Sequence, residues 1–310
     1  MSYTFVDYYY EDGIHPDDKI LKSLSELLED IVYYLKPFQF IFACIGFIFN
    51  ILHVLVVSRK PLRSISVYVI MIGIGVCDLY TMLTVIHRLL NEYIALFNGT
   101  DCYIPPGYWK TVINFWIGCL MDVFRRLSTW LALLMALVRL LIIKNPMNSN
   151  CISLSSPSFA YTCISIITFI SFTITFFNWG QYSIVDNGPM KIRFCKYLPK
   201  NYTVPHTYTY EMAEFVDDFR PLAMKYTKFS DGISKIIPTL LLPFFSFSLI
   251  RYVQKVSKSS KNLMKLSKDR EAEKSIKMVT IMTVFSMIAE GPTGVLSAIQ
   301  TFYLDYSAIS

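Results

Sequence analysis

The chain has 310 residues, of which 54% are hydrophobic and only 17% charged, and its formal net charge is +6 at pH 7. A soluble domain usually has about a quarter of its residues charged, and here the apolar residues occur in long continuous blocks. Only helices and closed barrels satisfy their backbone in lipid, and these blocks are too continuous for alternating barrel strands. We therefore predict an all-α, polytopic helical membrane bundle and exclude an ordinary soluble domain.

The apolar blocks divide the chain into an N-terminal segment over residues 1–36, a transmembrane bundle over 37–303 and a short tail over 304–310. Six spans are predicted in the bundle, at about 38–57, 65–87, 111–143, 158–178, 233–252 and 276–302. Residues 1–30 are acidic and tyrosine-rich, without the basic start and apolar core of a signal peptide. No internal repeat is visible, which argues against a duplicated transporter.

Charge next to the spans predicts the orientation. Basic residues dominate the loop after the first span and the linker 251–277, so these face the cytoplasm and both termini of the predicted six-span chain lie outside. Because the positive charge lies in cytoplasmic loops, it does not indicate nucleic-acid binding. The sequons at Asn98 and Asn201 then fall in outer loops, where glycosylation occurs. Cys102 and Cys195 alone lie in oxidising surroundings, and we predict a disulfide between them.

The third span carries charges that lipid does not tolerate. Asp122, Arg125 and Arg126 occupy one helical face, because residues three and four apart are neighbours on a helix. A charge at mid-bilayer costs about 2.5–3.5 kcal/mol on insertion scales. We therefore predict that this span is central, and that Asp122 pairs with the two arginines. Such pairs fit either a ligand site or purely structural salt bridges.

Several stretches together resemble a rhodopsin-like G-protein-coupled receptor, and more closely the nematode serpentine chemoreceptors of class W, which are similar to FMRFamide-type peptide receptors. The stretches are GFIFNILHVLVVSRKPLRS, the CDL of the second span, CYIPPGYW, DVFRRLSTWLALLMALVRLLIIKNPM and AEGPTG. With the helix spacing, the resemblance covers about residues 35–305. The block in the third span is its most specific part.

The resemblance implies an interior cluster of Asn50, Asp78 and Ser128, where a sodium ion or water sits. A buried aspartate needs partners in any case, so a purely structural Asp78 is the alternative. The resemblance also implies that Arg139 engages the G protein. A positive-inside anchor that reaches the headgroups is the alternative for Arg139.

The family's acid before that arginine is Val138 here, and its following aromatic residue is Leu140, so the usual resting lock is missing. The resemblance implies hinges at Pro238 and Pro292, which agrees with the bending that a proline causes inside a helix. The family's tryptophan two residues before Pro292 is Glu290 in this chain.

An acid at the depth of Glu290 is placed to face Arg125 or Arg126. The candidate ligand-binding residues are therefore Asp122, Arg125, Arg126 and Glu290. The arginines favour an anionic ligand, whereas an Arg-amide peptide would prefer Asp122, Glu290 and the acidic N-terminus.

The predicted function is a plasma-membrane receptor whose partners are a peptide or small-molecule ligand, a heterotrimeric G protein and membrane lipid. A seventh helix is not found, so a non-signalling six-span remnant that acts as an interaction partner is the main alternative, and a channel or transporter a further one. No enzyme motif appears, and the four histidines lack metal-ligand spacing. We expect no enzyme activity, no cofactor and no metal.

Overall fold

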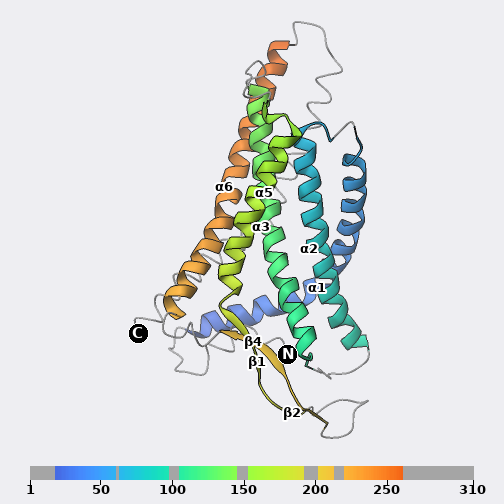
Figure 1. Ribbon diagram of the computed structural model, residues 1–310, viewed down its shortest axis with the longest axis vertical. Helices are drawn as coiled ribbons and strands as arrows, with labels where there is room; N and C mark the ends of the chain where they lie inside the picture. The colour runs from blue at the N-terminus through green and yellow to red at the C-terminus, as the bar shows by residue number, and fades with distance from the viewer. Residues whose placement is uncertain are drawn as a thin grey trace.

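The computed structural model describes residues 18–60, 63–97, 105–144, 153–191, 202–212 and 220–260. Its long helices are α1 (Asp18–Val57), α2 (Ser66–Phe97), α3 (Tyr108–Lys144), α5 (Pro157–Trp179) and α6 (Arg220–Ser260). Figure 1 shows them running side by side as an elongated bundle. The fold class is a helical membrane bundle, as the sequence predicted.

Five helices in the described part are long and apolar enough to cross a membrane. The crossing segments are Tyr34–Val57, Ser66–Leu90, Tyr108–Lys144, Pro157–Trp179 and Phe229–Tyr252. They correspond to the first five predicted spans. The predicted span 276–302 and the tail 304–310 lie outside the described residues.

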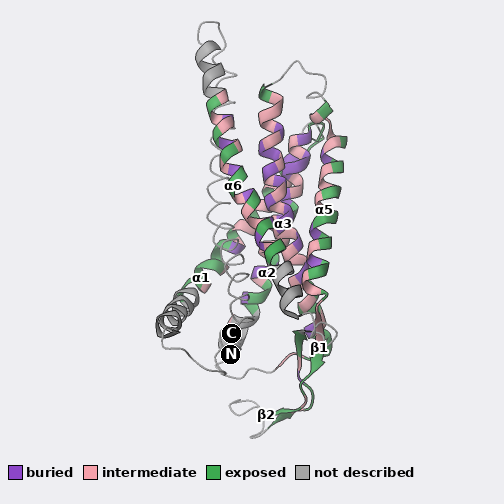
Figure 2. Ribbon diagram, turned by 90° about the vertical axis from the view of Figure 1, so that its left-hand side faces the viewer, coloured by how far each residue is buried: buried purple, intermediate pink, exposed green. Residues whose placement is uncertain are grey.

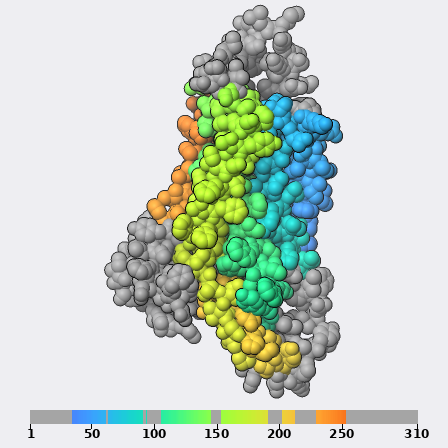
Figure 3. All heavy atoms as spheres, in the orientation of Figure 1, coloured from blue at the N-terminus to red at the C-terminus, as the bar shows by residue number. Residues whose placement is uncertain are grey.

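Helix α3 contacts α2, α5, α6 and strand β4 (Tyr208–Met212), which agrees with the central place that its charges predicted. Buried residues follow its length, from Thr111 near the start to Val138 near the end. Figure 2 shows this buried surface turned toward the neighbouring helices. Figure 3, in the orientation of Figure 1, shows α5 lying across the front of α2 and α3, with α6 along one edge.

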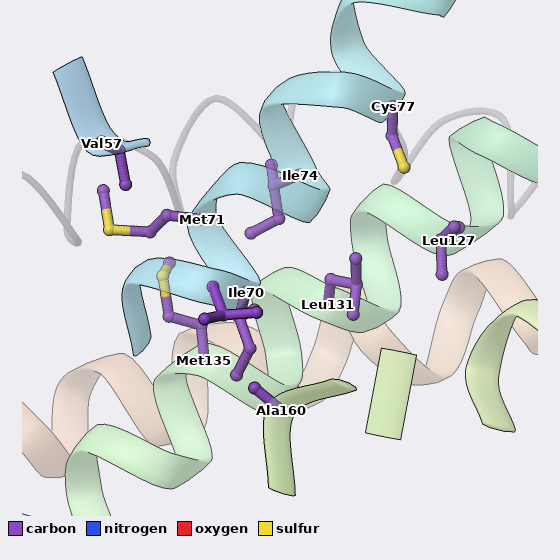
Figure 4. Packing of buried hydrophobic residues seen from close by; sticks show 10 residues of the cluster. Val57, Ile70, Met71, Ile74, Cys77, Leu127, Leu131, Met135 and Ala160 are labelled. Atoms are coloured by element: carbon purple, nitrogen blue, oxygen red, sulfur yellow. The ribbon is translucent and has the colours of Figure 1, made fainter. Parts of the chain in front are cut away.

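The main apolar core lies where α1, α2, α3 and α5 meet. Figure 4 shows Ile70 of α2 and Met135 of α3 converging on Ala160 at the start of α5. Leu131 and Ile70 are fully buried within this cluster. Burying one such side chain contributes about 1.5–3 kcal/mol in water, but lipid tails are also apolar. Close packing therefore holds these helices together rather than the hydrophobic effect.

Helix α1 is longer than the predicted first span. It begins at Asp18 and continues without a break through Pro37, which the sequence placed at the boundary of a separate segment. Figure 1 shows its first part turned across the end of the bundle, away from the direction of the crossing part. A proline inside a helix removes one backbone hydrogen bond and favours a bend of the axis, and α1 contains Pro37.

Short strands occupy the region between α5 and α6, where the sequence predicted a loop. Strands β1 (Tyr182–Asp186) and β4 pair antiparallel, and β2 (Met190–Lys191) pairs antiparallel with β3 (Thr203–Val204). Figure 1 shows these strands at the end of the bundle where α3 begins, here called the strand end. The alternating threonines and tyrosines of residues 207–210 were the available signal, because aromatic and β-branched residues favour strands.

Helices α1 and α2 approach each other closely at Gly75. A Cβ atom built on Gly75 lies 2.6 Å from Cγ2 of Val54, closer than side-chain atoms can pack. Val54 is β-branched and has little rotamer freedom in a helix, so it cannot easily move aside. The absence of a side chain at Gly75 is therefore what allows this contact.

We expect Gly75→Ala to destabilise the bundle by about 1–3 kcal/mol, the usual cost of overpacking, when thermal unfolding is measured in detergent. Adding Val54→Ala should restore much of the loss. The matched control is Gly46→Ala, whose Cβ would lie 3.6 Å from the flexible Met82 Sδ and should have little effect. Equal losses for the two alanine variants would contradict this account of the α1–α2 contact.

Candidate functional site

A buried arginine joins three helices near the middle of the bundle. Arg126 of α3 is 3% exposed. Its Nη1 donates to the Ser171 carbonyl oxygen at 3.1 Å and to Thr175 Oγ1 at 2.9 Å, both on α5. On α6, its Nε donates to Ser234 Oγ at 3.1 Å and its Nη2 donates to Asp231 Oδ1 at 2.6 Å. Four of the five N–H groups of a guanidinium are thus engaged.

Asp231 is shared between two cations. Lys235, one turn further along α6, donates from Nζ to Asp231 Oδ2 at 2.6 Å. Arg126 holds the other carboxylate oxygen, so the three side chains form an Arg–Asp–Lys triad. The Asp231 and Lys235 side chains are 17% and 18% exposed, whereas that of Arg126 is 2% exposed. Within the triad, the Arg126 side chain is therefore buried, whereas the Lys235 side chain is more accessible.

The triad lies beside a proline in α6. Pro238 has no N–H, so the carbonyl four residues earlier, that of Ser234, loses its helical partner. The indole Nε1 of Trp130 on α3 donates to this carbonyl oxygen at 3.1 Å. The Ser234 hydroxyl accepts from Arg126 and donates to the Asp231 carbonyl oxygen at 2.7 Å. Two side chains of α3 thus stabilise the proline-disturbed turn of α6.

The structure corrects the predicted partner of Arg126. Helical spacing placed Asp122 within reach of it, but its guanidinium turns toward α5 and α6 and pairs with Asp231. Asp122 accepts a hydrogen bond at Oδ2 from Trp179 Nε1 at 2.8 Å instead. Neighbouring helices offer Arg126 four oxygen acceptors at once, which a single carboxylate on its own helix cannot. Arg125 is half-buried on α3.

Aromatic side chains cover α3 at the strand end. The ring of Trp179 lies 5.1 Å from that of Phe115 and 6.3 Å from that of Tyr210 on β4. Tyr182 on β1 lies 6.0 Å from Trp179, and burial raises the pKa of its hydroxyl. Trp179 thus contacts the strands with its ring and Asp122 with its N–H. The strands are thereby joined to the charged part of α3.

The predicted interior polar cluster is partly assembled. Ser128 of α3 donates from Oγ to Asp78 Oδ1 of α2 at 2.8 Å, which gives this half-buried acid a partner. Asn50 is half-buried on α1. In the described part of the chain, no group of three or more His, Cys, Asp or Glu side chains is arranged to hold a metal ion.

Arg139 lies at the end of α3 away from the strands. It is half-buried, and its Nη2 approaches Sδ of Met71 on α2 at 3.5 Å. The preceding Val138 is buried in the bundle at 1% exposure. A thioether is a weak acceptor, so this contact holds Arg139 far less firmly than an acid would.

Several predicted site residues lie outside the described residues. They are Asn98 and Asn201 of the sequons, Cys102 and Cys195 of the predicted disulfide, and Glu290 and Pro292 of the sixth span. The glycosylation, disulfide and ligand roles assigned to them remain predictions.

Sequence reasoning missed most of the acceptors around Arg126. Ser171 and Thr175 lie in an apolar span that gave no reason to single them out, and they are buried at 1% and 4% exposure. Asp231 was assigned to the end of a loop, because the fifth span was predicted to begin at 233. The available signal was the spacing of Asp231 and Lys235, because an acid and a lysine four residues apart are neighbours on a helix. This spacing would have placed the start of the fifth helix before residue 231.

The fold and this core define a helical membrane bundle with charged groups in its interior and Arg139 near the far end of its third helix. The family model for the serpentine type 7TM GPCR chemoreceptor Srw matches residues 37–310. The chain therefore belongs to the Srw family of seven-transmembrane chemoreceptors, as its sequence resemblance indicated. A comparison with curated proteins gave no match.

We expect Trp130→Phe to destabilise the receptor by about 1–2 kcal/mol, because it leaves the Ser234 carbonyl without a donor in an apolar setting. Thermal unfolding in detergent measures this. Trp116→Phe is the matched control, since Trp116 lies on the same helix and is 60% exposed. Equal effects of the two substitutions would argue against the Trp130 hydrogen bond.

The strands should respond to acid through Asp186. The Gly188 backbone N–H and His206 hold the pKa of this carboxyl below its ordinary 3.8, with His206 Nδ1 at 2.6 Å. A lowered pKa stabilises the folded form above the ordinary value, and the contribution is lost as pH falls through the lowered pKa. The protection of amide hydrogens in residues 182–191 and 202–212, corrected for the intrinsic pH dependence of exchange, should therefore fall below about pH 4. Asp186→Asn should abolish this step, and a step of the same size in that variant would exclude Asp186 as its cause.

Proposed function

We propose that the chain is a chemosensory receptor of the plasma membrane that binds an extracellular ligand beside the charged core and activates a heterotrimeric G protein. Membership of the Srw family supports the receptor class. The observation that carries the rest is the Arg126–Asp231 pair, which has a buried arginine and a half-buried aspartate, joins α3 to α6 and lies within the membrane-crossing part of both helices.

A buried ion pair often stabilises a fold no more than well-packed apolar residues of similar volume would. Its presence in a membrane span therefore favours a role in function. A ligand that changes the triad would act directly on Ser234, whose carbonyl lies opposite Pro238 in the disturbed turn. The proposal thus couples ligand binding to the bend of α6 at Pro238 and to a movement of the sixth predicted span about Pro292.

The four candidate ligand-binding residues all remain in the proposal, but they have different roles. Asp122, Arg125 and Glu290 are proposed to meet the ligand. Arg126 is proposed as a positioning residue, because its guanidinium is buried and engaged by α5 and α6. The ligand is a peptide or a small molecule.

At the other end of the bundle, Arg139 is proposed to contact the G protein. Its weak contact with Met71 supports this role, since little interaction is lost when the arginine turns away. Asn50, Asp78 and Ser128 are proposed to hold an ion or water between the two ends. The strand end is proposed to face outside, with the Cys102–Cys195 disulfide and glycans on Asn98 and Asn201.

The test is G-protein activation in cells that carry the receptor at a measured surface level and are exposed to a panel of water-soluble and volatile compounds. We expect Arg139→Ala to lower the response to an active compound by roughly 10–100-fold, the value of one charge-assisted contact of about 1.5–3 kcal/mol. Lys144→Ala is the matched control, since Lys144 is an exposed cation of the same helix.

An unchanged response of Arg139→Ala at equal surface level would exclude the proposed coupling role. A receptor that reaches the surface and activates no G protein with any compound would favour the non-signalling alternative.

A further inference from the structure

The Arg–Asp–Lys triad has two cations and one anion. Asp231 gives one carboxylate oxygen to Arg126 and the other to Lys235, at 2.6 Å in both cases. Its charge can offset only one of its two partners. An uncompensated charge inside a membrane protein is costly unless an anion or water meets it.

The two cations differ in their capacity to meet another anion. Arg126 is closed in by Ser171, Thr175 and Ser234, and its side chain is 2% exposed. Lys235 has three N–H donors, of which Asp231 accepts one, and its side chain is 18% exposed. The accessible positive charge of the triad is therefore at Lys235.

Lys235 lies on the inward face of α6. The exposed apolar residues of this helix, among them Ile233, Ile237 and Leu240, follow one stripe that suits lipid. Residues three and four apart share a helix face, so Lys235 lies with Asp231, Pro238 and Leu242 on the opposite side. An anion bound to Lys235 would thus lie inside the bundle.

The acids in the described crossing segments near this point already have donors. Asp231 is held by the two cations, and Asp122 accepts from the Trp179 indole at 2.8 Å. A cationic ligand would therefore compete with existing bonds, whereas an anionic one would meet N–H donors of Lys235 that no described residue occupies.

We propose that Lys235 binds the carboxylate of the receptor's ligand, which is therefore an organic acid or a molecule that carries a free carboxylate. This inference rests on the proposed function and names the ligand class of the same core. The carboxylate shares the Lys235 ammonium with Asp231 and weakens their bond. Asp231 and Ser234 adjoin the turn disturbed by Pro238, so binding at Lys235 acts where α6 bends.

The experiment uses the full chain in lipid nanodiscs. The probes are straight-chain carboxylates from acetate to decanoate and benzoate, each paired with its uncharged primary amide. We expect at least one acid to raise the thermal midpoint while its amide does not. Lys235→Gln should weaken that binding by roughly 10–100-fold, and Lys235→Arg, which keeps the charge, should retain it.

Lys144→Gln, which removes an exposed cation far from the triad, is the control and should bind as the unmodified chain does. Lys235→Met provides a second neutral variant should Lys235→Gln fold poorly. The proposal is overturned if no acid shifts the midpoint, if acids and amides act equally, or if both neutral variants bind the acid normally.

The alternative is that Glu290 of the same chain, and not a ligand, supplies the carboxylate that meets Lys235. If it meets Lys235, Glu290→Gln and Lys235→Gln will lower stability equally without ligand and no acid will shift the midpoint, which overturns the proposal. Suppose that uncharged compounds activate a G protein and that Arg139→Ala abolishes this response. The proposed function would then stand, while the inference of a carboxylate ligand would fail.

Discussion

The pairing of Arg126 with Asp231 is the interaction on which the arrangement of α3, α5 and α6 depends. Removing Asp231 would leave Arg126 and Lys235 without their shared anion, and loss of one partner from a buried pair costs about 3–5 kcal/mol. The arginine also binds a backbone carbonyl and a hydroxyl of α5, so its position fixes three helices together. Lipid offers no alternative donors or acceptors to these groups. The polar core therefore specifies which helix faces meet, while the apolar core holds α2 against α3 by close packing.

The same core sets the local shape of α6. Pro238 leaves the Ser234 carbonyl without a helical donor, and α3 supplies Trp130 in its place. Ser234 is thus held from α3 at its carbonyl by an indole and at its hydroxyl by a guanidinium. A proline bend that relies on another helix for its hydrogen bond can change only when the contact between the helices changes. This arrangement links the conformation of α6 to the charge balance around Asp231.

Composition and apolar blocks were enough to predict the fold class and the places of the five described crossing segments, because lipid imposes one strong constraint on the backbone. The charges of α3 correctly indicated its central place. They misled on the partner of Arg126, since local spacing favours Asp122 and only the packed bundle brings Asp231 within 2.6 Å. Ser171 and Thr175 carry no signal of their own, because small polar residues are common in membrane helices. The strands were missed because β1 and β4 pair across a long separation in the chain.

Trp179 gives the bundle a mechanical property that neither the strands nor the helices have alone. Its ring packs among Phe115, Tyr182 and Tyr210, while its N–H holds Asp122, one helical turn before Arg126. Trp179 therefore links the strands to Asp122, in addition to the direct ring contacts of Tyr108 with Tyr208 and of Phe115 with Tyr210. A substitution among these aromatic residues is consequently expected to shift Asp122, and with it the turn of α3 that carries Arg126, although the strands lie beyond the end of the helices.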